Sequence, residues 1–228
     1  MNDFALVTEG VSDHAVLKNI LIGFFGNQRR PDITFEWPNP VAVEKYGGWT
    51  LVLQYLRDKK YRETLQANRF VVVQIDTDVA EEPGFDVPKQ GSNGTLSVEE
   101  LVGNVVKRLQ KEIGDEDWET YGESFIFAVG VEQTECWVLP LWFNDNRAEQ
   151  TANCLDRLGK CPQLRDALDA KNLPWISAKR KEPLSYDLAS RGLRKRDILL
   201  DRGASNPSLR IFLNELLART IVLQPIEE

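Results

Sequence analysis

Histidine, cysteine and long apolar runs are scarce in this chain of 228 residues, and each scarcity removes a class of chemistry. His14 is the only histidine, so a histidine-based triad or a histidine-rich metal site lacks its further members. The cysteines, Cys136, Cys154 and Cys161, match no spacing typical of structural zinc sites. General acid–base chemistry in this chain must therefore rely on carboxylates or lysine.

Membrane and export signals are also lacking. No apolar run approaches the roughly 20 residues that a bilayer-spanning helix needs. Residues 1–10 lack the basic region and the long apolar stretch of a secretory signal peptide. We therefore expect a cytoplasmic protein without a membrane anchor, and we expect its cysteines to stay reduced there.

Charge is present in both signs but is spread unevenly. Hydrophobic residues make up 42% and charged residues 28% of the chain, as in ordinary soluble proteins. The formal net charge of -7 argues against nonspecific binding of nucleic acid over the whole surface. Residues 177–219 nevertheless carry a net charge of +5, which leaves -12 elsewhere. This asymmetry indicates either a phosphate-binding face set against an acidic metal centre, or only a set of solvated helix faces.

The hydrophobic pattern alternates between strands and helices. Strand-like segments cover residues 4–8, 33–37, 70–75 and 124–129. Helical patterns cover residues 12–24, 49–65 and 97–113. This alternation predicts an α/β fold with a mostly parallel sheet of about four strands flanked by helices. We expect residues 1–143 to form this domain, and residues 144–228 to form a helical C-terminal extension packed on it.

The segment from Phe70 to Asp78, FVVVQIDTD, is the most informative in the chain. Its continuous apolar run suits a central parallel strand that is covered on both faces. In open parallel sheets, ligands bind outside the carboxyl ends of the strands, and Mg²⁺ prefers carboxylate oxygens. Asp76 and Asp78 are therefore candidate metal ligands. The alternative is an ordinary acidic turn after a strand.

Acidic side chains follow two further predicted strands. Glu9 follows the first strand, and Glu132 and Glu135 follow the fourth. Because parallel strands bring their carboxyl ends to one edge, we expect these acids to gather with Asp76 and Asp78. Carboxylates in such a cluster repel one another unless a cation lies between them, which favours metal binding over coincidence. If the last segment is helical, Glu132 and Glu135 share one face.

These segments resemble a known family. FALVTEGVS at 4–12, VVVQIDTD at 71–78 and VGVEQTECWVLPLW at 129–142 are together similar to a Toprim domain, the metal-binding fold of topoisomerases, primases and the OLD family of nucleases. The resemblance covers about residues 4–143 and is strongest to the small standalone Toprim proteins of prokaryotic defence loci. In those proteins a glutamate follows the first strand, a DxD motif follows a later one, and a segment like E-x-E-x-W-x-L follows the next. The spacing of Glu132 and Glu135 departs from that pattern, which leaves open which of them is the working acid.

The resemblance implies a metal-dependent nuclease that hydrolyses phosphodiester bonds. Glu9 would be its general acid or base, and Asp76 and Asp78 would hold Mg²⁺ or Mn²⁺. Such a protein would be the toxic effector of an anti-phage defence system, acting on DNA or tRNA together with an ATPase partner. The tryptophan-rich segment 137–142 also allows a homodimer. We expect nucleic acid to contact the basic residues of the C-terminal part, namely Lys179, Arg180, Lys181, Arg194, Lys195 and Arg196.

Two other functions compete with this one. A HAD-like phosphatase would use Asp76 as the nucleophile and Asp78 as the acid or base. Such enzymes usually carry the motif on their first strand, whereas here two predicted strands precede it. A non-catalytic Toprim-like scaffold would bind an ATPase partner or nucleic acid without cutting. The presence of acids after all three strands weighs against the scaffold.

Overall fold

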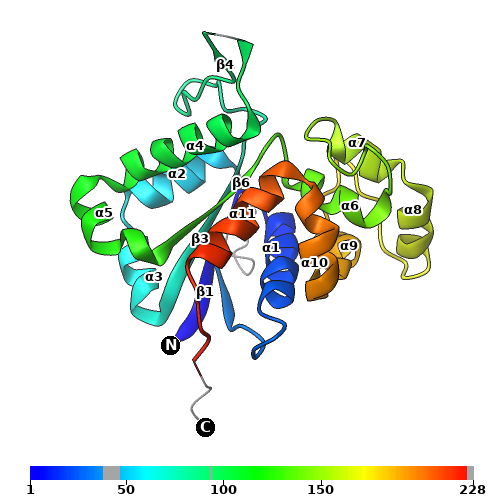
Figure 1. Cartoon of the computed structure of the whole chain (residues 1–228), viewed down its shortest axis with the longest axis horizontal. Coiled ribbons are helices and arrows are strands. Elements are labelled where there is room, and N and C mark those ends of the chain that lie inside the picture. The colour runs from blue at the N-terminus through cyan, green and yellow to red at the C-terminus, as the bar shows by residue number, and fades with distance from the viewer. Residues whose placement is uncertain (38–46, 93, 225–228) are drawn as a thin grey trace. The chain divides into compact units, whose positions relative to one another are not determined.

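The computed structural model describes residues 1–37, 47–92 and 94–224 (Figure 1). Its strands are β1 (Asn2–Val7), β2 (Ile33–Trp37), β3 (Asn68–Asp76), β4 (Gln90–Gly91), β5 (Gly94–Thr95) and β6 (Phe125–Gly130). Its α-helices are α1 (Val11–Phe24), α2 (Trp49–Arg57), α3 (Tyr61–Ala67), α4 (Val98–Ile113), α5 (Asp115–Tyr121), α6 (Leu139–Trp142), α7 (Cys154–Gly159), α8 (Pro162–Asp169), α9 (Pro183–Ser190), α10 (Arg196–Asp201) and α11 (Pro207–Ala218). Short 3₁₀ helices are η1 (Gly122–Ser124), η2 (Thr134–Val138), η3 (Arg191–Arg194) and η4 (Gly203–Ser205).

Four of the strands form one parallel sheet in the order β2-β1-β3-β6. β3 lies inside the sheet, pairing with β1 on one side and with β6 on the other. Its residues from Val71 to Asp76 are all buried, as expected for a strand covered on both faces. The prediction of an α/β fold with a parallel sheet of about four strands flanked by helices is therefore confirmed. In the described residues beyond Phe143, helices follow one another and no strand joins this sheet.

The chain divides into two compact units, each built from separate stretches. Unit 1 comprises Met1–Val11 and Asp32–Glu132 and holds the sheet with α2 to α5. Unit 2 comprises Ser12–Pro31 and Gln133–Glu228 and holds nearly all of α1 together with α6 to α11. We expected a boundary at residue 143, whereas contacts group the first helix and residues 133–143 with the C-terminal part.

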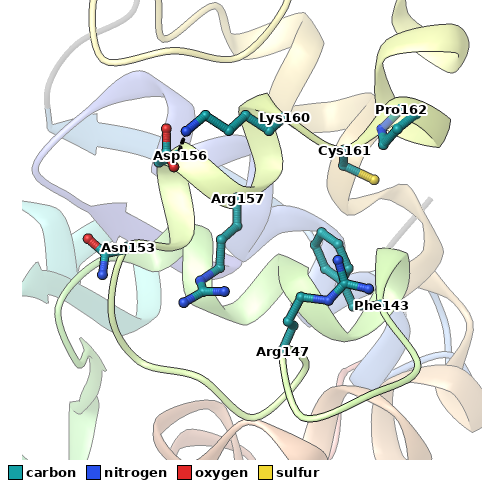
Figure 2. Close-up of a pocket in the computed structure, with 8 residues that line it drawn as sticks. All are labelled: Phe143, Arg147, Asn153, Asp156, Arg157, Lys160, Cys161 and Pro162. Carbon is teal, nitrogen blue, oxygen red and sulfur yellow. Dashed lines mark hydrogen bonds and ion pairs between the residues drawn. The ribbon is translucent and has the colours of Figure 1, made fainter.

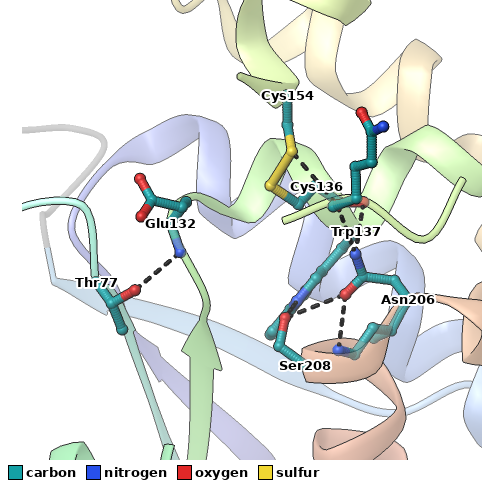
Figure 3. Close-up of a disulfide and its surroundings, with 9 residues drawn as sticks. Thr77, Glu132, Cys136, Trp137, Cys154, Asn206 and Ser208 are labelled. Carbon is teal, nitrogen blue, oxygen red and sulfur yellow. Dashed lines mark hydrogen bonds between the residues drawn. A yellow bond between two sulfur atoms is a disulfide. The ribbon is translucent and has the colours of Figure 1, made fainter. Parts of the chain in front are cut away.

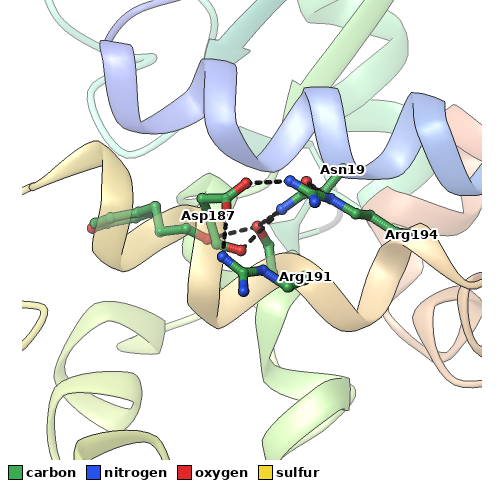
Figure 4. A network of polar contacts seen from close by, with 6 residues as sticks. Asn19, Asp187, Arg191 and Arg194 are labelled. Atoms are coloured by element: carbon green, nitrogen blue, oxygen red, sulfur yellow. Dashed lines mark hydrogen bonds and ion pairs between the residues drawn. The ribbon is translucent and has the colours of Figure 1, made fainter. Parts of the chain in front are cut away.

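A polar network shows why α1 belongs with unit 2 (Figure 4). Asn19 on α1 is fully buried, and its Nδ2 donates to Ser190 Oγ at 2.8 Å and to the Asp187 carbonyl at 3.1 Å. Asn19 Oδ1 accepts from Arg194 Nε at 2.6 Å, and Arg194 also pairs with the Asp187 carboxylate at 2.5 Å. A buried amide satisfied at both ends fixes the helix in place. These contacts therefore bind α1 to residues that lie near the other end of the chain.

Gly23 allows a close approach within the same unit. A Cβ at this position would lie 1.9 Å from the carbonyl oxygen of Leu193, a distance that no side chain tolerates. The backbone of α1 therefore contacts η3 directly, and this contact needs glycine.

The helix predicted over residues 49–65 is wrong in one respect, because the structure has two helices there. Lys59 adopts a φ of 57°, in the left-handed region, which separates α2 from α3. Asp117 of α5 compensates for this break. Its nearly buried carboxylate lies 3.4 Å from Lys59 Nζ and 2.5 Å from Arg62, and it accepts a hydrogen bond from the Tyr61 hydroxyl.

The helix predicted from Ser97 is confirmed. Ser97 Oγ accepts from the Glu100 amide at 3.2 Å, and the Glu100 carboxylate accepts from the Ser97 amide at 2.8 Å. This capping box satisfies amides that the first turn would otherwise leave unpaired. Across the described residues, no helix is both long enough and apolar enough to cross a membrane.

The expectation that the cysteines stay reduced is wrong for two of them. Cys136 in η2 and Cys154 at the start of α7 form a disulfide, with Cα atoms 5.0 Å apart (Figure 3). The turn of the chain through α6 brings these positions together, which their separation of 18 residues does not reveal. Cys161 is a free thiol and is buried. Beside the disulfide, Trp137 is fully buried and stacks on Phe212.

Candidate functional site

Glu9 and Asp76 lie next to each other at the carboxyl edge of the sheet. β1 and β3 are parallel neighbours, so the residues that follow them leave the sheet side by side. Glu9 Oε1 accepts a hydrogen bond from the Asp76 amide at 2.7 Å. Asp76 is 6% exposed, and Glu9 is partly exposed. The structure thus brings together two of the acids that the sequence singled out.

Gln74 joins these two acids through its side chain. It is fully buried, its Oε1 accepts from the Glu9 amide at 3.1 Å, and its Nε2 donates to Asp76 Oδ1 at 2.8 Å. The amide holds the backbone of one acid and the carboxylate of the other, which orients them before a ligand arrives. We did not single out Gln74 from the sequence. Its signal was a polar residue inside an otherwise apolar strand.

The loop before α2 holds Glu9 from outside the sheet. The Glu9 carbonyl accepts from the Gly48 amide at 2.7 Å. A Cβ on Gly47 would lie 2.2 Å from the same carbonyl oxygen, so glycine is needed for this approach. The backbone of Glu9 is therefore fixed from two directions, by Gln74 and by this loop.

Asp78 takes part in the strand exit through its backbone. Its side chain is exposed, its amide donates to the Glu132 carbonyl at 3.0 Å, and its own carbonyl accepts from Lys89 Nζ at 3.0 Å. Within the described ranges, no three Asp, Glu, His or Cys side chains lie close enough together to hold a metal ion. The acids that we expected to gather are therefore arranged around the edge and do not form a single cluster.

Glu132 occupies a strained position at the exit of β6. Its φ is 60°, so it is not helical, and the condition under which it would share a helix face with Glu135 is not met. Its amide donates to Thr77 Oγ1 at 2.8 Å (Figure 3), and its carbonyl accepts from the Thr77 amide at 3.2 Å. Its carboxylate pairs with Lys89 at 3.1 Å. A left-handed backbone costs a residue with a Cβ about 1 kcal/mol, and here hydrogen bonds to Thr77 and Asp78, the residues that follow β3, hold it.

Glu135 belongs to unit 2 and is fully buried. Its Oε1 accepts from the Tyr186 hydroxyl at 2.6 Å and lies 3.1 Å from Lys181 Nζ. Its Oε2 is buried and has no hydrogen-bond partner among the described residues. Of the two glutamates that the sequence left open, Glu132 is thus the one in the same unit as Glu9 and Asp76.

The basic residues predicted to bind nucleic acid divide into two groups. Three of them make contacts inside unit 2: Lys181 with Glu135, Arg194 with Asp187, and Arg196 with the carbonyl of Phe24. The other three, Lys179, Arg180 and Lys195, are exposed, and Lys181 is exposed as well although it is paired. Half of the predicted set therefore stabilises the unit itself, which reduces the charge left for a ligand.

The carboxyl edge of the sheet thus carries a network of Glu9, Gln74 and Asp76. Glu132 at the neighbouring exit of β6 pairs with Lys89, which precedes β4. The residues joined by these hydrogen bonds all belong to unit 1. No protein-family model, no curated protein and no solved structure matches the chain.

Proposed function

We propose that this protein is a divalent-metal-dependent nuclease of the Toprim type. The observation that carries the proposal is the Glu9–Gln74–Asp76 network at the carboxyl edge of a parallel sheet. That edge is where open α/β sheets bind their ligands. Two oriented carboxylates at such a place suit the binding of a cation and of the phosphate that the cation attracts.

The donor set at this edge fits Mg²⁺ or Mn²⁺. Mg²⁺ usually binds through one or two carboxylates and completes its coordination with water and with substrate phosphate oxygens. Glu9 and Asp76 would supply the carboxylates. Asp78 follows Asp76 by two residues and its amide donates to the Glu132 carbonyl, so both acids are near enough to add oxygens when a substrate arrives. The bound cation would neutralise charge on the scissile phosphate and lower the pKa of its bound water.

The two acids differ in exposure, and this difference assigns their roles. Asp76 is 6% exposed and accepts from Gln74, so it is suited to hold a cation in one place. Glu9 is partly exposed, so its carboxylate can exchange a proton with substrate or solvent. We therefore assign Glu9 as the general acid or base and Asp76 as the principal metal ligand.

The proposed substrate is nucleic acid, either DNA or tRNA. Lys179, Arg180 and Lys195 are exposed and available for contacts with phosphate. As in the defence proteins that the sequence resembles, the protein would act in the cytoplasm as an effector controlled by an ATPase partner. Disulfides in that compartment are subject to reduction, so the Cys136–Cys154 bond would be open to cleavage there.

The proposal is tested by assaying cleavage of duplex DNA, single-stranded DNA and total tRNA with Mg²⁺, Mn²⁺ or EDTA. The proteins compared are the wild type, Glu9→Gln, Asp76→Asn and the control Glu82→Gln, an exposed acid in the same unit. We expect metal-dependent cutting by the wild type and the control. We expect it to fall by at least about 100-fold in Glu9→Gln and Asp76→Asn, the usual scale for loss of a catalytic proton-transfer group.

A thermal melting experiment distinguishes an enzyme that is inactive without its partner from a non-catalytic scaffold. A cation that binds the native state must raise the melting temperature. If Mg²⁺ raises the melting temperature of the wild type but not of Asp76→Asn, the assignment of the metal site is supported even if the isolated protein does not cut. Cutting by Asp76→Asn at the wild-type rate would contradict the assignment. The absence of both cutting and metal response would favour a non-catalytic scaffold.

A further inference from the structure

Unit 2 contains a pocket of about 410 Å³ whose lining residues all come from the segment 143–162 (Figure 2). The segment begins after α6 and includes α7 and the start of α8. None of these residues belongs to the network around Glu9 and Asp76, which lies in unit 1. The pocket is therefore a separate place to look for a ligand.

The charge of the pocket is positive. Arg147, Arg157 and Lys160 line it, against one acid, Asp156. Lys160 Nζ lies 2.8 Å from the Asp156 carboxylate, and Arg147 is held by Asp145 at 2.6 Å. Arg157 has no ion pair or side-chain hydrogen bond among the described residues. One guanidinium in the pocket wall is thus not neutralised by the protein.

The buried part of Arg157 makes this lack of a partner costly. Its Nε atom is buried, and no acceptor lies within hydrogen-bond distance of it in the described structure. A buried donor without an acceptor costs about 1–3 kcal/mol, and most such donors in native proteins have a partner such as a water or a ligand. An oxyanion in the pocket would supply the missing acceptor and neutralise the charge.

The start of α8 lies at the same wall. Cys161 and Pro162 line the pocket, and α8 begins at Pro162 with no side chain capping its first turn. The positive end of the helix dipole favours an anion there. A volume of about 410 Å³ exceeds the needs of a bare ion and lies in the range of pockets that hold small organic ligands.

We propose that this pocket binds the phosphate group of a ligand of nucleotide size. Arg157 is the central contact, because a guanidinium pairs with phosphate through two parallel hydrogen bonds. Lys160, whose side chain is 70% exposed, adds charge at the rim. The same phosphate chemistry comes either from a free nucleotide or from the phosphorylated end of a nucleic acid. The proposal goes beyond the nuclease site and does not depend on it.

The test measures the melting temperature with inorganic phosphate, adenosine 5′-monophosphate, and an oligonucleotide with or without a 5′-phosphate, against chloride at equal ionic strength. The variants are Arg157→Met and Lys160→Met. The control is Lys171→Met, which removes the same charge at an exposed position outside the pocket. We expect phosphate ligands to stabilise the wild type and the control, with the shift lost in Arg157→Met and reduced at least by half in Lys160→Met.

The arms of the experiment distinguish the two sources. A larger shift with the nucleotide than with either oligonucleotide identifies a free nucleotide, and a shift that requires the 5′-phosphate on the oligonucleotide identifies a nucleic acid end. The proposal is overturned if no phosphate ligand shifts the wild type beyond chloride, or if Arg157→Met responds in full. Should Arg157→Met not fold, a full response of Lys160→Met overturns it, since that exposed side chain is dispensable for folding. Cleavage is not measured, so the outcome is independent of the nuclease proposal.

Discussion

Gln74 organises the candidate metal site although it carries no charge. It stands where the pattern of β3 calls for an apolar residue, and it is fully buried. Both ends of its amide are used, since the oxygen accepts from the Glu9 backbone and the nitrogen donates to the Asp76 carboxylate. The reverse orientation of the amide would leave both partners facing atoms of the wrong kind. One side chain thus sets the geometry of two acids.

Replacing Gln74 by glutamate tests this arrangement through pH. Gln74→Glu keeps the shape but places a second carboxyl beside Asp76, and repulsion and burial raise the pKa of the introduced group above its ordinary value of about 4.3. An acid whose pKa is higher in the folded state loses stability as the pH rises above its unfolded value. We therefore expect the free energy of unfolding, relative to the wild type, to fall between about pH 4 and pH 8.

The matched variant Gln74→Met removes the same hydrogen bonds without adding a charge. Its loss, about 1–3 kcal/mol, should not vary with pH over that range. Urea unfolding at several pH values measures both variants. If the two pH profiles are parallel, Gln74 does not contact the Asp76 carboxylate in the way described.

Glu132 provides a second test at the level of one residue. Its φ of 60° favours glycine, so Glu132→Gly should be more stable than Glu132→Ala by about 1 kcal/mol. Both variants lose the ion pair with Lys89, so the comparison isolates the backbone. At Lys107, exposed within α4, the order should be reversed, because alanine is favoured in helices by about 1 kcal/mol. Chemical denaturation of the four variants measures the difference in stability between glycine and alanine at each position. If alanine is the more stabilising residue at position 132, the left-handed backbone is ruled out.

At the scale of elements, the disulfide joins η2 to α7. Closing a loop of this size in the unfolded chain is worth about 3 kcal/mol. We expect a reducing agent to lower the melting temperature of the wild type and of Cys161→Ser equally. The double variant Cys136→Ser/Cys154→Ser should already melt at the lower temperature and should not respond. Protein purified without reducing agent should show one reactive thiol when it is denatured and titrated. Three reactive thiols would exclude the bond.

Asp117 ties the α2–α3 break to α5 and gives stability a dependence on pH. Its hydrogen bond from Arg62, with further bonds from Tyr61 and Lys59, holds the pKa of the Asp117 carboxyl well below its usual range. Because this pKa is lower in the folded state, the stabilisation is present at neutral pH and is lost as the pH falls below about 4.

Asp117→Asn should accordingly lower the free energy of unfolding at pH 7 by about 1–3 kcal/mol. The difference from the wild type should shrink in acid, where the wild-type carboxylate also loses its charge. Thermal melts between about pH 2 and pH 7 measure it, with the exposed Asp115→Asn as the control. A difference that stays constant into acid would mean that the ion pairs do not carry the effect.

For the whole molecule, the sequence predicts the sheet well because each strand is specified locally. β2 has the predicted bounds, Ile33–Trp37, and the other three strands of the sheet shift by at most two residues at either end. The meeting of Glu9 and Asp76 also follows from the pattern, since parallel neighbours must end at one edge. The same logic did not identify Gln74 or Lys89, whose roles depend on partners from other segments.

What the pattern did not predict depends on contacts between distant residues. The break at Lys59 is stabilised by Asp117, and the disulfide depends on how α6 and α7 turn. Membership of α1 in unit 2 depends on Asn19 and Gly23, which meet partners beyond residue 186. Local periodicity carries no information about such partners, so a boundary drawn from composition at residue 143 did not reveal the division.

The grouping of α1 with the C-terminal helices also bears on how the protein is made. Asn19 leaves the ribosome long before Arg194, its hydrogen-bond partner 175 residues later. At typical synthesis rates of about 5–20 residues per second, this delay is on the order of ten to thirty seconds. During that time the C-terminal partners of Asn19 and Gly23 are not yet made. Completion of unit 2 is therefore a late event in the synthesis of the chain.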